Sequence, residues 1–350
     1  MSLCHEEISG QENGLLLAAD IGGTKSDIAI FRPNLSCTVP VYKKRYLNRN
    51  FSGVLELVDS FLASSNYVPT VGCLAVAGIV RGNCVQMTNL PWKVDGVDIE
   101  KRFGFKRITI INDMTGLCSS LPQLATDDLF EIQRGTRQKG GVRAVVAVGT
   151  GLGEGLFAEI DGRGFPWGTE GGHVDFAPVD DVQLSLLKWM QGRGEHVNYE
   201  MVIGGVGLSD LYDFCREYYK LSGSSHISEA MGKQQDRTPL IIDGVLNDPP
   251  CSLCIKVIEL FLTILGGEAG NLALKVYADG GLYIGGGIVP RLLGKISFTG
   301  FLESFRNKGI MADMLSNIPV YVIKKEDAGL VGAACFAANS FFVSTTLSDP

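Results

Sequence analysis

Two glycine-rich turns, each lying between apolar segments of β type, constrain the fold of this chain more than any other feature. The first, DIGGT at residues 20–24, follows the run LLLAA and precedes DIAIF. The second, GTGLG at residues 149–153, follows AVVAV and precedes EGLFAEI. Short alternating segments on both sides of a glycine turn predict a β-hairpin at each place.

Both turns are suited to binding phosphate. Glycine has no Cβ, so its backbone N–H can approach an anionic oxygen, and a concave row of such groups binds anions without a basic side chain. The common nucleotide loops run from a strand into a helix, and neither GxxxxGK[ST] nor GxGxxG occurs here. The sequence therefore predicts two phosphate-binding hairpins.

Length and charge limit the function classes. A chain of 350 residues favours two domains and hence a cleft between them. The net charge is −7 and no long Lys/Arg run occurs, so we expect no nucleic-acid partner. The longest apolar stretches are far shorter than the roughly 20 residues of a membrane span, and the N-terminus lacks a signal-peptide core. We expect a cytoplasmic protein that does not enter a membrane.

The nine cysteines favour reduced, mostly buried thiols, because an odd number is scattered through a long chain. Cys251 and Cys254 form one CxxC at the start of a helical pattern. A single CxxC without further ligands is weak support for zinc, so we interpret the pair as structural.

Strands mixed with amphipathic helices predict an α/β layered fold. Residues 1–14 are expected to form a flexible tail. Residues around 126–142 are polar and basic, and QRGTRQKGG at residues 133–141 is interpreted as an exposed loop. Helices are expected to dominate residues 182–279, and a strand followed by a helix closes the chain. The two hairpins and the helices after them indicate a weak internal duplication.

Two acidic positions stand at predicted strand ends. Asp20 precedes the first glycine turn, where a carboxylate can hold Mg²⁺ through water; a plain turn aspartate is the alternative. Asn112 and Asp113 end the strand ITII, where open sheets place their sites, although Asn-Asp is also a common turn signal. A carboxylate placed there can accept the proton of an alcohol during phosphoryl transfer.

EGGHVDF supplies Glu170 and His173, and Glu200 begins a later helical segment. Carboxylates and imidazoles bind paired sugar hydroxyls through strong hydrogen bonds, and a metal site is the weaker alternative. His196 is interpreted as a structural residue in a helical region. Three glycines at residues 285–287 lie between a strand and a helix expected near Pro290; they can approach a nucleotide or pack strand on helix.

Five ordered motifs together resemble the bacterial-type glucokinases of the hexokinase and actin-like ATPase superfamily. The resemblance runs from about residue 15 to residue 337, and the motifs are DIGGTK, INDMTG, VAVGTGLGEGLF, EGGHVDFAP and GGLYIGGGIVPRLL. After DIGGT this chain has KSD at residues 25–27, whereas this group more often has NAR or a close variant. The resemblance implies two ribonuclease-H-like (actin-like ATPase) domains flanking a deep interdomain cleft. The small domain comprises residues 15–123 with 325–350, and the large domain residues 124–324.

The resemblance also implies an ATP-dependent phosphorylation of glucose to glucose 6-phosphate by a cytoplasmic homodimer. Asp113 would be the general base for the 6-hydroxyl, and Asp20 would organise Mg²⁺. The sugar hydroxyls would contact Asn112, Asp113, Glu170, His173 and Glu200. The nucleotide would contact Gly22, Gly23, Thr24, Gly149, Thr150, Gly151, Gly285, Gly286 and Gly287. Open alternatives are another hexose or N-acetylhexosamine as substrate, polyphosphate or ADP as donor, and a catalytically inactive sugar sensor.

Overall fold

A computed structural model describes residues 14–33, 36–194, 196–223 and 237–341. The tail expected at residues 1–14 therefore lies almost wholly outside the described residues. The chain divides into unit 1, Met1–Leu124 with Asp327–Pro350, and unit 2, Ala125–Glu326. The domain boundaries expected after residues 123 and 324 remain a prediction.

Unit 1 is built on a five-stranded sheet with the order β3-β2-β1-β4-β8. Its first three strands form an antiparallel meander, whereas β1, β4 and β8 are parallel. The strands are β1 (Leu16–Ile21), β2 (Lys25–Phe31), β3 (Tyr42–Leu47), β4 (Val71–Val76) and β8 (Arg107–Asn112). The predicted hairpin at the first glycine turn is thus confirmed, because Ile21 pairs with Ser26 across it.

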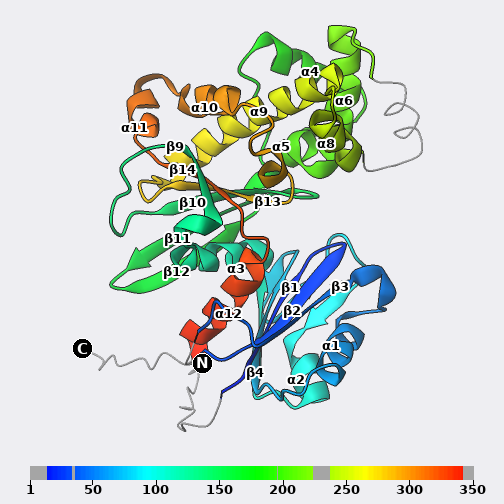
Figure 1. The fold of residues 1–350 in the computed structure, drawn as a ribbon, viewed down its shortest axis with the longest axis vertical. Coiled ribbons are helices and arrows are strands. Elements are labelled where there is room, and N and C mark those ends of the chain that lie inside the picture. The colour runs from blue at the N-terminus through cyan, green and yellow to red at the C-terminus, as the bar shows by residue number, and fades with distance from the viewer. Residues whose placement is uncertain (1–13, 34–35, 195, 224–236, 342–350) are drawn as a thin grey trace. The chain divides into compact units, whose positions relative to one another are not determined.

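Helices cover both faces of this sheet (Figure 1). The helices are α1 (Val54–Ala63), α2 (Gly96–Phe103), α3 (Asp113–Ser120) and α12 (Ala328–Phe341). Alternate residues of β1 point to opposite faces: Leu17 packs in the core with α1, and Leu16 packs in the core with α12. In α1 the buried residues recur at the spacing of one helical face. Both faces of the sheet are therefore buried at β1, which explains why its sequence is a continuous apolar run.

A small antiparallel sheet is also part of unit 1. It contains β5 (Val80–Arg81), β6 (Cys84–Gln86) and β7 (Lys93–Asp95). Asp95 then caps α2, since its side chain accepts a hydrogen bond from the Val97 N–H, and Gly104 ends that helix in the left-handed conformation.

Unit 2 contains a six-stranded sheet with the order β12-β11-β10-β13-β14-β9. Its strands are β9 (Leu129–Gln133), β10 (Arg143–Val148), β11 (Leu152–Ile160), β12 (Arg163–Thr169), β13 (Leu282–Gly286) and β14 (Val320–Ile323). The second predicted hairpin is confirmed, because Val148 pairs with Leu152 across the glycine turn.

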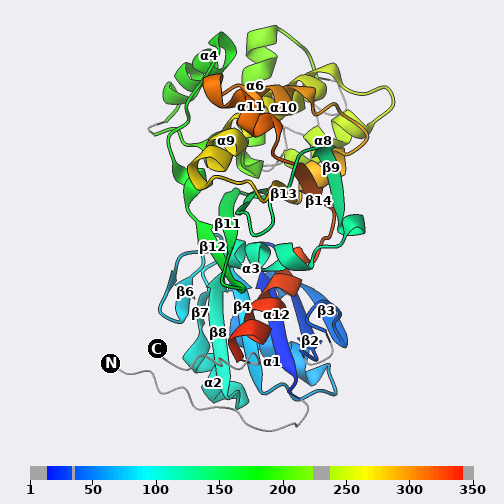
Figure 2. The same ribbon diagram turned by 90° about the vertical axis from the view of Figure 1, so that its left-hand side faces the viewer.

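The helices of unit 2 gather on one side of this sheet (Figure 2). They are α4 (Asp181–Gln191), α5 (Tyr199–Ile203), α6 (Gly205–Tyr219), α8 (Thr238–Leu246), α9 (Ser252–Val276), α10 (Thr299–Arg306) and α11 (Ala312–Ser316). The predicted dominance of helices over residues 182–279 is confirmed for the described part of that range. The long helix α9 supplies 15 buried residues, so it forms the centre of the core of this unit.

The two sheets repeat one plan. In each, a three-stranded antiparallel meander is followed by two parallel strands: β3-β2-β1-β4-β8 in unit 1 and β12-β11-β10-β13-β14 in unit 2. The first glycine turn joins β1 to β2, and the second joins β10 to β11. The internal duplication expected from the two hairpins is therefore present in the fold.

Two local expectations need correction. The exposed loop expected at residues 133–141 is confirmed from residue 134 on, but the polar stretch before it, residues 129–133, forms the edge strand β9, which pairs antiparallel with β14. Much of β9 is exposed, and this weakens its apolar signal. The helix expected near Pro290 is only the four-residue 3-10 helix Val289–Leu292, and Gly294 soon follows in a left-handed conformation. Within the described residues, every helix is too short or too polar to cross a bilayer.

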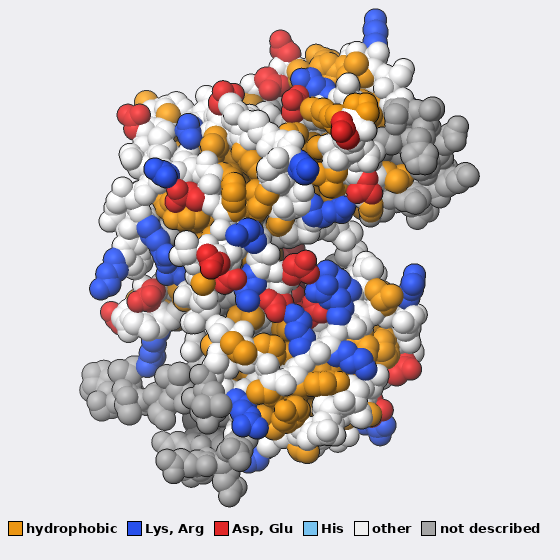
Figure 3. Space-filling view, in the orientation of Figure 1, with side chains coloured by type: hydrophobic (Ala, Val, Ile, Leu, Met, Phe, Trp, Pro, Cys, Tyr) orange, Lys and Arg blue, Asp and Glu red, His pale blue; other side chains and the backbone are white. Residues whose placement is uncertain are grey.

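The cysteines described by the structure follow the expected pattern. All eight are free thiols, and six of them are buried. Cys251 precedes α9 and Cys254 lies in its first turn, both in the core of unit 2. Figure 3 shows acidic and basic side chains mixed over the visible face of each unit. The surface displayed there carries no continuous field of one sign.

Candidate active site

The first glycine turn is held in place by Asn48, a buried residue that follows β3. Its Nδ2 donates to the carbonyl oxygen of Gly22 at 2.8 Å, and its Oδ1 accepts from the Ser26 hydroxyl at 2.7 Å. The Asn48 N–H also donates to the carbonyl of Thr24 at 2.9 Å. One buried amide thus fixes both sides of the turn. No sequence motif had identified it.

Asp20 lies in β1 beside this turn, in an acidic setting. Burial raises the pKa of its carboxyl to about 7, and repulsion from Asp113 and Asp27 adds to the rise. A side chain at Gly329, near the start of α12, would overlap the Asp20 carboxylate and would require it to move. Asp27 is itself neutralised by Arg45, which donates to its two oxygens at 2.7 and 2.8 Å.

Asn112 and Asp113 lie where β8 ends and α3 begins. Asn112 is the N-cap of α3: its Oδ1 accepts from the N–H groups of Met114 at 2.9 Å and Thr115 at 3.3 Å. Its Nδ2 donates to the carbonyl of Gly78 at 3.2 Å. The cap leaves Asp113 at the first position of the helix, near the positive end of the helix dipole, where a carboxylate is favoured.

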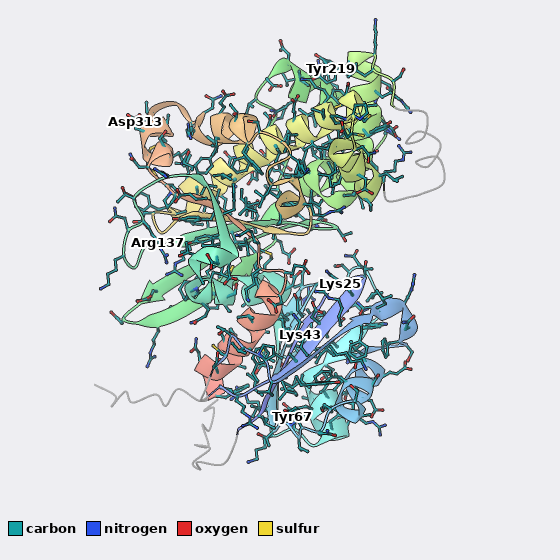
Figure 4. The ribbon with its side chains drawn as sticks, viewed as in Figure 1. Lys25, Lys43, Tyr67, Arg137, Tyr219 and Asp313 are labelled. Carbon is teal, nitrogen blue, oxygen red and sulfur yellow. The ribbon has the colours of Figure 1, made fainter. Side chains whose placement is uncertain are left out.

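These acidic residues share one edge of the sheet. Strands β1, β4 and β8 are parallel, so their carboxyl ends, at Asp20 and Asn112, face the same way. Figure 4 shows Lys25 at this end of β2 and Tyr67 at the opposite end of unit 1. The repulsion between Asp20 and Asp113 agrees with this placement.

The second glycine turn is bonded to the start of α5 and to the start of α6. The Leu152 N–H donates to Oε2 of Glu200 at 2.9 Å, and the Gly205 N–H donates to the carbonyl of Gly149 at 3.0 Å. A Cβ at Gly151 would overlap the Glu200 carboxylate, so only glycine allows this approach. Thr150 lies between these two glycines.

Glu170 and His173 of the EGGH segment and Glu200 of α5, all predicted to bind the sugar, lie together in unit 2. Nδ1 of His173 is 3.8 Å from Oε2 of Glu170, and its Nε2 is 3.6 Å from Oε1 of Glu200. All three side chains retain access to solvent, with 54%, 56% and 35% of Glu170, His173 and Glu200 exposed. The imidazole stands between two carboxylates, an arrangement suited to paired hydroxyl groups.

The glycines at residues 285–287 have different surroundings. Gly285 and Gly286 pair with Ala147 and Val148 of β10. A Cβ at Gly286 would overlap the backbone of Val148, so close packing explains this glycine. Gly287 is exposed and has open space where a Cβ would lie. The contact at Gly286 is with the neighbouring strand β10 and is not the packing of strand on helix left open above; approach to a nucleotide remains a prediction for these glycines.

His196 was expected in a helical region, and this is wrong. It lies in the loop between α4 and α5 because α5 begins only at Tyr199, after its cap Asn198. Its exposed ring is 3.3 Å from Oδ1 of Asp175.

A magnesium ion fits the donors near Asp20. The candidate ligand is a carboxylate whose charge is opposed by neighbouring carboxylates, and hard cations prefer such oxygen donors. Within the described part of the chain, no group of three or more His, Cys, Asp and Glu forms a ready-made metal cage. A Mg²⁺ ion held at Asp20 through water stays a prediction.

The repeated sheet plan, with a glycine hairpin in each unit, defines an α/β protein of the actin-like ATPase fold. A family model described as glucokinase matches residues 17–340, and the chain belongs to this family of enzymes. It is 34% identical to a glucokinase of Nostoc punctiforme over 93% of this chain and 99% of that protein.

Solved structures give the same result. A glucokinase from an Antarctic psychrotroph has a TM-score of 0.77 at 28% identity, over 93% of this chain and 99% of that chain. A glucokinase from Balamuthia mandrillaris in complex with glucose also has a TM-score of 0.77, over 95% of both chains. Its identity is 19%, so this likeness concerns the fold.

Proposed function

We propose that this protein transfers the γ-phosphoryl group of ATP to the 6-hydroxyl of glucose, giving glucose 6-phosphate and ADP. The observation that carries the proposal is the convergence of Glu170, His173 and Glu200 beside the second glycine hairpin. Charged acceptors on both sides of an imidazole bind vicinal hydroxyls well. A phosphate-binding turn next to such a group suits a sugar that receives phosphate.

Asp113 is the proposed general base. The 6-oxygen of the sugar attacks the γ-phosphorus, its proton passes to the Asp113 carboxylate, and the bond to the bridging oxygen of ADP breaks. Asn112 supports this role because its cap fixes the first turn of α3, where Asp113 begins. Phosphoryl transfer depends mainly on position and charge, so one held carboxylate is sufficient.

The two glycine turns are the proposed phosphate contacts, through the backbone of Gly22, Gly23, Thr24, Gly149, Thr150 and Gly151. Asp20 would hold Mg²⁺ through water, and when bound this ion neutralises the negative charge of the phosphates. Gly287 offers exposed backbone to the nucleotide.

Production of ADP on mixing the protein with glucose and Mg·ATP tests the proposal. A panel with mannose, fructose and N-acetylglucosamine ranks the sugars, and ADP or polyphosphate in place of ATP tests the donor. A higher kcat/KM for another sugar would change the proposed substrate and leave the proposed mechanism unchanged. Glucose binding without ADP release would favour a sugar sensor. Sedimentation of the purified protein tests the proposed homodimer, and fractionation of cells tests the cytoplasmic location.

A further inference from the structure

Two carboxyl side chains are buried together beneath the sugar-binding loop. Glu154 of β11 is 2% exposed and Glu268 of α9 is 0% exposed. They lie close enough for the charge of Glu268 to raise the pKa of the Glu154 carboxyl, in addition to the larger effect of burial. Two carboxylates cannot share a dry site as anions without a large cost, so one of them keeps a proton and donates it to the other.

The surroundings identify Glu268 as the acceptor. Nδ2 of Asn271 donates to its Oε2 at 2.8 Å, and Nζ of Lys275 is 3.4 Å from its Oε1. Tyr199 lies beside it: burial, and then the charge of Glu268, raise the pKa of the Tyr199 hydroxyl. A second cation, Lys308, bonds Oδ1 of Asn271 at 2.7 Å. Positive charge and donors thus collect around Glu268.

Glu154 has no such support. Its Oε1 is buried and, among the described residues, has no hydrogen-bond partner. Burial raises the pKa of the Glu154 carboxyl to about 7, and the charge of Glu268 raises it further, against the attraction of Lys275. Glu154 is therefore the member of the pair that carries the proton.

The pair supports the backbone that presents the sugar-binding side chains. A Cβ at Gly171, the residue after Glu170, would overlap Oε2 of Glu154, so the loop rests directly on this carboxyl. The Thr169 hydroxyl donates to the Glu154 carbonyl at 3.3 Å and accepts from the Gly171 N–H at 3.2 Å. The loop that ends at His173 is thus fixed to β11.

Glu268 reaches the other side of the site through Tyr199. This residue immediately precedes Glu200, and its N–H donates to the carbonyl of Val174 at 3.1 Å. Its ring packs edge-on against Phe176, with centroids 5.5 Å apart. Beneath the site, β11, α5 and α9 therefore meet around this pair of carboxyl groups.

We propose that Glu154 and Glu268 form a carboxylic acid–carboxylate pair that positions Glu170, His173 and Glu200 for the sugar. Both are positioning residues and neither touches the substrate. This inference rests on the proposed function for one point, which is that the ligand is a sugar. Loss of the shared proton places two negative charges in one dry site, and the repulsion displaces Gly171 and Tyr199. Sugar binding then weakens at high pH, while the phosphoryl-transfer step is less affected.

The test is the pH profile of glucose KM and kcat between pH 6 and 9. In the unaltered protein we expect KM to rise at least about threefold from pH 6.5 to 8.5, with a smaller change in kcat. Glu154→Gln keeps a donor and cannot ionise, so its KM should stay low and level. Glu159→Gln, on an exposed position of the same strand, is the matched control and should keep the slope of the unaltered protein.

A slope of KM in Glu154→Gln equal to that of the unaltered protein would overturn the proposal. Carboxyl ¹³C signals of labelled glutamate, compared with those of Glu154→Gln and Glu268→Gln, report the pair without activity. A resonance titrating near neutral pH and lost in Glu154→Gln is expected; its absence in the unaltered protein also refutes the pair. If the protein makes no ADP with any sugar, the proposed function fails, and the carboxyl titration still decides the pair.

Discussion

The carboxylate of Glu200 accepts a hydrogen bond of 2.9 Å from the backbone N–H of Leu152, which belongs to the second glycine turn and begins β11. The same side chain faces His173 at 3.6 Å through its other oxygen. One residue therefore joins the proposed sugar site to the proposed phosphate turn. Removal of this side chain should therefore affect both substrates together.

Glu200→Ala removes the acceptor of Leu152 and one partner of His173. We expect KM to rise for glucose and for ATP, each by roughly tenfold, since a hydrogen bond to a charged group contributes about 1.5–3 kcal/mol. Glu200→Gln keeps an acceptor for Leu152, so it should raise KM for glucose and leave KM for ATP nearly unchanged. Steady-state kinetics with both substrates varied measure the difference. Equal effects of the two variants on ATP would contradict the link.

Asp113→Asn tests the general base. Asparagine keeps the size of the side chain and cannot accept the proton, so kcat should fall at least about 100-fold. Glucose binding, followed by calorimetry, should change less. Asp98→Asn, at an acidic first-turn position of α2, is a control for loss of one charge in unit 1. Turnover of Asp113→Asn equal to that of the unaltered protein would remove the assignment.

The sequence allowed prediction where the signal is local. Both hairpins, the strand end at Asn112 and the start of α5 follow from runs of adjacent residues. Three features could not be predicted, because they depend on distant parts of the chain. Asn48 reaches the first turn from beyond β3, and Glu154 meets Glu268 only when α9 packs beneath β11. The edge strand β9 has a neighbour on one side only and exposes much of its length, so its sequence resembles a loop.

Asn48→Ala should loosen the first glycine turn. The change leaves the carbonyl of Gly22 and the hydroxyl of Ser26 without their buried partner. We expect a loss of about 1–3 kcal/mol in the free energy of unfolding, together with a higher KM for ATP. Asn50→Ala, at an exposed position nearby, is the matched control and should change neither quantity. Urea unfolding and ATP kinetics measure the two effects. An unchanged KM for ATP would show that Asn48 does not support ATP binding through the turn.

The buried acid Glu154 should make stability depend on pH. Its carboxyl ionises near pH 4.5 in the unfolded chain and near pH 7 in the folded protein, so between these values the folded state holds more protons. The free energy of unfolding therefore falls as pH rises through this window. The stability of the unaltered protein relative to Glu154→Gln should fall by about 1–3 kcal/mol between pH 5 and pH 8. Asp20 titrates in both proteins and cancels from this difference, and a constant difference would contradict the assignment.

Cys37 should be a reactive thiol of unit 1. The S–H of Cys335, in α12, donates to the sulfur of Cys37 at 2.7 Å, and this bond lowers the pKa of the Cys37 thiol to about 7. The thiolate is the nucleophile, so iodoacetamide at pH 7 should modify Cys37 before the fully buried Cys73, whose pKa burial raises. Cys335→Ala removes the donor and should slow modification of Cys37 at pH 7 several-fold, with little change at pH 10. Peptide mapping by mass spectrometry gives each rate. An unchanged rate at pH 7 in this variant would show that Cys335 does not activate Cys37.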